Sequence, residues 1–199
     1  MKGLFVTILI LLALLPALLQ SPPTLGGKLA MAAPALAPDG ANLARQNPTV
    51  RIEPAESVVG AGQTFTITVM IEEADDLGGF EFTLLFVTTT VTVDSVTVGD
   101  FPGSTGRTAI PIGPTSDNQA GMASFGVVTV PPDIPGPSGT GVLATVTLTA
   151  QGPGESPLDL QDVLVVDTNA RPKTPTVEDG VVRAGFAVYL PLILKDWPK

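Results

Sequence analysis

Two stretches of alternating polar and apolar residues constrain the fold of this chain more than any other feature. Residues 64–71 read Thr-Phe-Thr-Ile-Thr-Val-Met-Ile, and residues 80–86 repeat the period with Phe80, Phe82, Leu84 and Phe86 on one side. A period of two is typical of a strand with one buried face and one face in water. An acidic run at 72–76 joins the stretches, and we expect them to pair as the start of an antiparallel sheet.

The rest of the chain favours more strands of the same kind. It contains 21 Gly and 20 Pro, which suits many short strands joined by turns. Further strand-like stretches lie at 50–53, 91–98, 122–130, 141–149, 158–166 and 180–183. Residues 102–121 are rich in Pro, Gly, Ser and Thr, and only 108–112 looks extended. We therefore expect an all-β fold, an antiparallel two-sheet sandwich of jelly-roll type with about nine strands.

The N-terminal residues have the pattern of an export signal. Lys2 precedes a nearly unbroken apolar run at 4–15, and small residues follow. This order is typical of a secretory signal peptide; an uncleaved anchor is the alternative, but the run is short and Pro16 interrupts it. We expect a signal peptide at 1–32, a flexible leader at 33–47, the folded domain at 48–184 and an apolar tail at 185–199. The protein is then extracellular or at the cell surface.

Composition excludes several functions. The chain has no Cys and no His, so it has no disulfide, no Cys- or His-ligated metal and no Ser-His-Asp or Cys-His arrangement. Residues 48–184 carry 17 acidic and five basic side chains, a net charge of −12. Such a domain is repelled by phosphates and anionic lipid, so we expect no nucleic-acid partner and, after signal removal, no membrane partner. We expect no enzymatic activity, no bound metal and no cofactor.

Four stretches in a fixed order resemble the cohesin domain of bacterial cellulosome scaffoldins and cell-surface proteins. They are the Gly-x-Gly turn and strand at 60–71, the strand at 77–86, the Val-x-Val-Gly-x-Phe element at 96–101 and the strand at 141–148. The resemblance covers about 48–184. One departure follows Phe86, where the family has Tyr-Asp-Pro and this chain has Phe86-Val87-Thr88. The family shares its broad fold with some carbohydrate-binding modules, so fold alone does not separate the two functions.

The resemblance implies a non-catalytic module that docks a dockerin-type partner on another exported protein, in polysaccharide degradation or surface attachment. Calcium would then belong to the partner, and we expect the module itself to be a monomer. The family's late loop and the neighbouring sheet face lie near the partner. From this loop we take Asp167 and Asn169 as candidate contacts, although Asp167-Thr168-Asn169 is most simply an Asx turn.

The water-facing sides of the first two strands supply the other candidate contacts. Thr66 and Thr68 come from the first strand, and Glu81, Thr83 and Leu85 from the second. Leu85 is apolar on an otherwise polar side, as an interface anchor would be, or else it lies under a covering loop.

Several alternatives stay open at this point. The first is a carbohydrate-binding module, against which the absence of Trp and Tyr from 48–184 counts; the second is a structural or adhesive surface protein. The acidic run Glu72, Glu73, Asp75 and Asp76 is either a calcium ligand set or, more simply, a solvated turn. The apolar tail is either a sorting segment or an extra strand.

Overall fold

The computed structural model describes residues 47–131 and 133–185, which form two sheets. The predicted signal peptide, most of the leader and nearly all of the tail lie outside the described residues. Within the described residues, no helix has the length and hydrophobicity needed to cross a bilayer. The smaller sheet has the order β11 (Thr176–Glu178), β1 (Thr49–Glu53), β3 (Thr64–Ala74), β8 (Gly139–Ala150) and β5 (Val91–Val98). The larger sheet has the order β2 (Glu56–Gly60), β12 (Gly180–Gly185), β9 (Gly154–Asp167), β4 (Leu77–Leu85), β7 (Met122–Val130) and β6 (Thr108–Asp117), and β10 (Pro172–Lys173) pairs with β9.

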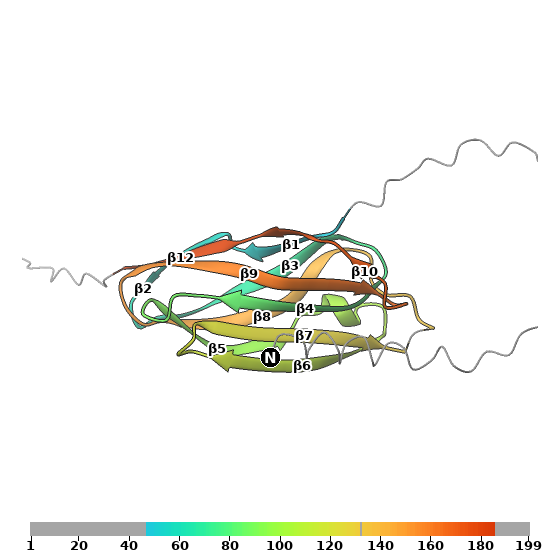
Figure 1. Ribbon diagram of the computed structural model, residues 1–199, viewed down its shortest axis with the longest axis horizontal. Coiled ribbons are helices and arrows are strands. Elements are labelled where there is room, and N and C mark those ends of the chain that lie inside the picture. The colour runs from blue at the N-terminus through green and yellow to red at the C-terminus, as the bar shows by residue number, and fades with distance from the viewer. Residues whose placement is uncertain (1–46, 132, 186–199) are drawn as a thin grey trace, which may run out of the picture.

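The two sheets pack face to face as a sandwich, which confirms the predicted fold class. Figure 1 shows β9, β4, β7 and β6 side by side across the molecule. The described residues form twelve strands where about nine were expected, because short strands at both ends of the domain add pairs to the sheet edges. Two of these edge pairs, β1 with β11 and β2 with β12, are parallel, so each sheet is mixed.

The expected pairing of the first two alternating stretches is wrong. β3 pairs with β1 and β8 in the smaller sheet, whereas β4 pairs with β7 and β9 in the larger one. Alternation specifies which side of a strand is buried, but it does not determine which strand pairs with it. Glu73, near the end of β3, and Asp76, in the connection to β4, adopt positive φ angles of 56° and 57°, and the chain crosses here to the other sheet.

The core lies between the inner faces of the two sheets. Three rings from the larger sheet, Phe80, Phe82 and Phe125, have centroids 6.2–6.3 Å apart and are almost fully buried. Aromatic pairs at this distance add to the free energy of burial. Phe101, in a short 3₁₀ helix (η2, Phe101–Gly103), is 9% exposed and belongs to the same core. The smaller sheet contributes Val50, Ile52, Ile67, Val69, Ile71, Val91, Val93, Ala144, Val146 and Leu148.

Candidate functional site

The outer face of the larger sheet is arranged in rows that cross β6, β7, β4 and β9. Each row takes one residue from each strand, in that order. The register gives the rows Ile110–Val128–Gly79–Val166, Ile112–Gly126–Glu81–Leu164, Thr115–Ser124–Thr83–Gln161 and Asp117–Met122–Leu85–Asp159. We call the first two of these the apolar rows. They hold five branched apolar side chains, two glycines and a single ionisable group.

The apolar rows face away from the core because the inward positions of the same strands are already filled. Phe80, Phe82 and Leu84 point inward from β4, so the residues between them point outward. Ile110 is 41% exposed, and Ile112, Val128, Leu164 and Val166 are half-buried. A contiguous apolar surface on a sheet whose core lies on the other side is typical of an interaction surface.

Glu81 is the ionisable group in the apolar rows, and it is 8% exposed. Burial raises the pKa of its carboxyl, and the negative charge of nearby Asp162 raises that pKa further. Within the described residues, no ion pair neutralises Glu81. A carboxylate held this way gains more than an exposed one from a donor supplied by another molecule.

The outer face of the smaller sheet is different in character. Its rows across β3, β8 and β5 are Thr68–Thr145–Thr97, Thr66–Thr147–Ser95 and Thr64–Thr149–Thr92. Several of these hydroxyls are bonded within the face; Thr64 and Thr149 lie 2.9 Å apart, and Thr149 donates to Asp94 at 2.7 Å. We call this surface the threonine face.

The structure therefore separates the candidate contacts taken from the two alternating strands. Thr66 and Thr68 lie on the threonine face, while Glu81, Thr83 and Leu85 lie on the opposite side of the sandwich. Thr83 is 3.1 Å from Ser124 in the third row, and half-buried Leu85 lies beside Met122, which is 37% exposed. Leu85 and Met122 form a second, smaller apolar pair at the far end of the same face.

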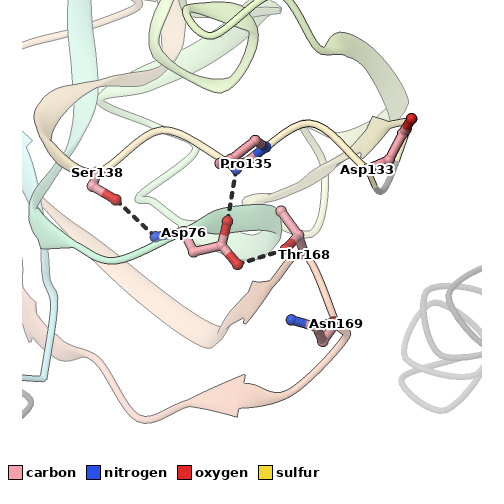
Figure 2. Close-up of a pocket in the computed structure, with 7 residues that line it drawn as sticks. Asp76, Asp133, Pro135, Ser138, Thr168 and Asn169 are labelled. Atoms are coloured by element: carbon pink, nitrogen blue, oxygen red, sulfur yellow. Dashed lines mark hydrogen bonds between the residues drawn. The ribbon is translucent and has the colours of Figure 1, made fainter.

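Asp167 and Asn169 lie where β9 ends, next to the start of β4. Asp167 accepts hydrogen bonds from the amides of Asn169 and Arg171, both 2.9 Å long, which confirms the predicted Asx turn. The neighbouring surface forms an open pocket of about 380 Å³. It is lined by Asp76, Asp133, Pro135, Gly136, Ser138, Thr168 and Asn169. Figure 2 shows the Asp76 carboxylate between the 135–136 backbone and Thr168, with Asn169 at the margin. Asn169 therefore lines this pocket, while Asp167 holds the turn beside it.

The acidic side chains at the end of β3 and in its connection to β4 bond to separate partners. Glu72 pairs with Arg51 at 2.8 Å, Asp75 pairs with Lys173 at 3.3 Å, and Asp76 bonds to the pocket walls. Among the described residues, no three His, Cys, Asp or Glu side chains are grouped so that they could hold a metal ion. The solvated-turn interpretation is therefore wrong for Glu72 and Glu73, which belong to β3, and only Asp75 and Asp76 lie in the connection to β4.

The sequence analysis missed most of the apolar rows. Ile110 and Ile112 lie in the piece that looked extended, 108–112, but that piece was given no buried or exposed side, and β6 continues beyond it to Asp117 through a register shift between Ile112 and Thr115. Gly113, with φ 96°, lies in this bulge. Leu164 and Val166 were placed in a strand, but the sequence did not show which side of that strand is buried. The reason is a bulge in β9 between Gln161 and Leu164, which interrupts the alternation of buried and exposed residues. The only local signal was the apolar residues on both faces of β9.

Comparisons with known proteins agree with the architecture. No protein-family model matches the sequence, and no curated protein matches it. Among solved structures, a non-cellulosomal cohesin from the archaeon Archaeoglobus fulgidus aligns with a TM-score of 0.56 at 18% identity, covering 70% of this chain and 92% of that one. A cohesin–dockerin complex from Clostridium thermocellum gives 0.57 at 15% identity, covering 70% and 99%. A type II cohesin from the cellulosome of Acetivibrio cellulolyticus gives 0.57 at 13% identity, covering 69% and 95%.

The chain therefore has a cohesin-like fold, as its sequence motifs suggested. The likeness extends over nearly the whole of each of these domains, at an identity that shows the fold alone. Which face of the sandwich acts, and on what, has to be argued from the residues of this chain.

Proposed function

We propose that this protein is an exported, non-catalytic docking module that binds a dockerin-type partner through the outer face of β6, β7, β4 and β9. The observation that carries the proposal is the contrast between the two outer faces. One presents the apolar rows around Glu81, and the other presents hydroxyls. Protein interfaces are centred on apolar side chains that lose water on binding, with polar groups at the rim.

Other features of the chain support this choice. The polar third row, with Thr83 and Ser124, and the carboxylates of Asp117 and Asp159 border the apolar surface as an interface rim would. The net charge of −12 between 48 and 184 favours a partner with basic groups. The signal-like N-terminus supports export. The solved Clostridium thermocellum complex is a precedent for a domain of this fold bound to a dockerin.

Direct sugar binding has less support. Flat sugar-binding surfaces use exposed aromatic rings, and the described residues contain only Phe as an aromatic type. Phe80, Phe82, Phe86, Phe101 and Phe125 are buried, and Phe65 is partly buried against the core. The part of the chain that the structure describes thus offers no aromatic platform.

The test is binding of the full chain to dockerin-type modules encoded by the same organism, with and without a calcium chelator. We expect saturable binding that the chelator abolishes, because the calcium would reside in the partner. Ile110→Asp should weaken binding at least about tenfold by placing a charge in the apolar rows. Thr66→Asp makes a similar change on the threonine face and should leave affinity within about twofold.

Two outcomes contradict the proposal. Equal losses with the two substitutions would mean that the apolar rows are not the docking surface. Absence of binding to any such module, together with retention of the full chain on insoluble cellulose or chitin, would favour the carbohydrate-binding alternative.

A further inference from the structure

The pocket described above lies at the same end of the sandwich as the apolar rows. β4 begins at Leu77, β7 ends at Val130 and β9 ends at Asp167, and the pocket residues follow directly from these three ends. The first apolar row, which contains Gly79 and Val166, is one step inside this boundary. A partner that covers the apolar rows therefore reaches the mouth of the pocket.

A buried arginine fixes the loop that forms one wall of the pocket. Arg107 is 4% exposed, and its guanidinium donates to the Thr129 hydroxyl at 2.7 Å and the Thr129 carbonyl at 2.6 Å. The same guanidinium donates to the carbonyls of Pro131 and Ile134. From behind this wall Arg107 shapes the pocket, and its positive charge attracts the carboxylates of Asp76 and Asp133. Two carboxylates face one guanidinium, so the pocket keeps a net negative charge.

Asp76 joins the other walls. Its carboxylate accepts from the Gly136 amide at 2.7 Å and from the Thr168 hydroxyl, while its own amide donates to the Ser138 hydroxyl at 3.0 Å. Burial raises the pKa of Asp76, but these hydrogen bonds and the charge of Arg107 outweigh it, and the pKa is lowered. The walls are thus held in place before any ligand arrives, which reduces the entropy lost on binding.

The lining groups define the chemistry of the ligand. Asp76 and exposed Asp133 supply negative charge, and the Ser138 and Thr168 hydroxyls supply further lone pairs. Lys173 is engaged with Asp75, outside the set that lines the pocket. A cation with several donors matches this set, and a planar guanidinium can contact two acceptors at once.

We propose that this pocket binds a basic side chain, arginine in the best fit, that the docked partner presents beside the apolar rows. The inference rests on the proposed docking function, because the docked partner is the molecule that would carry this side chain. The affinity of the pocket for a guanidinium is a separate property, and it can be measured without any partner.

The first experiment uses a small probe. The ¹⁵N-labelled full chain is titrated with N-acetyl-arginine methylamide and, as a neutral isostere, with N-acetyl-citrulline methylamide. We expect the arginine probe to shift the amide signals of Gly136, Ser138 and Thr168, with a dissociation constant on the order of millimolar. Asp133→Asn should weaken this binding about two- to fivefold. Asp94→Asn removes the same charge on the threonine face and should leave the binding of the probe unchanged. Equal shifts with both probes, or none with either, would overturn the proposal.

The second experiment asks whether the partner uses the pocket. With a dockerin-type module bound, Asp133→Asn should reduce affinity about two- to fivefold at low salt, and the difference should fade at high salt. If Ile110→Asp weakens docking and Asp133→Asn does not at any salt concentration, docking stands and the pocket proposal fails. If no module binds although the arginine probe does, the partner assignment is wrong and the docking function fails with it.

Discussion

Glu81 on β4 lies directly opposite Gly126 on β7, so one flank of this nearly buried carboxylate has no side chain. Its other flank is Leu164 on β9. The proposed docking surface is therefore built around a carboxylate that water cannot fully solvate and that has no ion-pair partner among the described residues. This arrangement has consequences for stability that can be measured without a partner.

Glu81→Gln should stabilise the protein at neutral pH. The folded pKa of Glu81 is raised, so the native state favours the protonated form and the ionised form costs stability above that pKa. We expect a gain of about 0.5–1.5 kcal/mol at pH 7. The gain should shrink as the pH falls through the raised pKa towards the unfolded value of about 4.3. Urea unfolding between pH 4 and pH 8 measures it, and a gain that does not depend on pH would show that the carboxylate is already well solvated.

Asp76 should show the opposite pH dependence. Its folded pKa is lowered, so its ionised form contributes stability above the unfolded value of about 3.9, and the contribution is lost as the pH falls through the folded pKa. We expect Asp76→Asn to be about 1–3 kcal/mol less stable than the parent at pH 7 and to approach it in acid. Asp133→Asn, on the exposed side of the same pocket, serves as the control for loss of charge alone. A deficit as large at pH 3 as at pH 7 would refute the electrostatic origin.

Arg107→Lys should be strongly destabilising although it keeps the charge. A lysine cannot reproduce the fork that reaches Thr129, Pro131 and Ile134, and buried acceptors would be left unsatisfied. We expect a loss of about 2–4 kcal/mol in the free energy of unfolding. Arg51→Lys tests an arginine in partly exposed ion pairs, which solvent screens, and should cost much less than Arg107→Lys. Equal effects at the two positions would mean that the loop does not depend on the guanidinium.

Gly78→Ala should disrupt the junction between β4 and β9. A Cβ atom at Gly78 would lie 2.2 Å from the carbonyl oxygen of Asp167, a backbone atom that cannot move without shifting the strand. We expect a loss of about 3 kcal/mol, at the upper end for overpacking. Gly103→Ala introduces the same methyl group where nothing lies within 4 Å and should change stability by less than about 0.5 kcal/mol. Thermal unfolding of the two variants gives the comparison.

Much of the fold could be predicted from the sequence because it depends on local patterns. Alternation at 64–71 and 80–86 identified which side of each strand is buried, and the predicted strand at 122–130 has the bounds that the structure gives β7. The Asx turn at Asp167 was also correct, since the side chain and the amides it bonds lie within four residues of each other. The motif order indicated the cohesin-like fold.

The buried side of the two clearly alternating strands, the all-β class and the absence of histidine and cysteine chemistry follow from the sequence alone, because they depend on residue type and spacing. Which strands are neighbours could be seen only in the folded structure. It placed Thr66 and Glu81 on opposite faces, joined Ile110, Val128 and Leu164 into one surface, and brought Asp76, Asp133 and Thr168 to one pocket. Strand pairing depends on contacts between residues far apart in the chain, and bulges such as those in β6 and β9 change which side a residue faces.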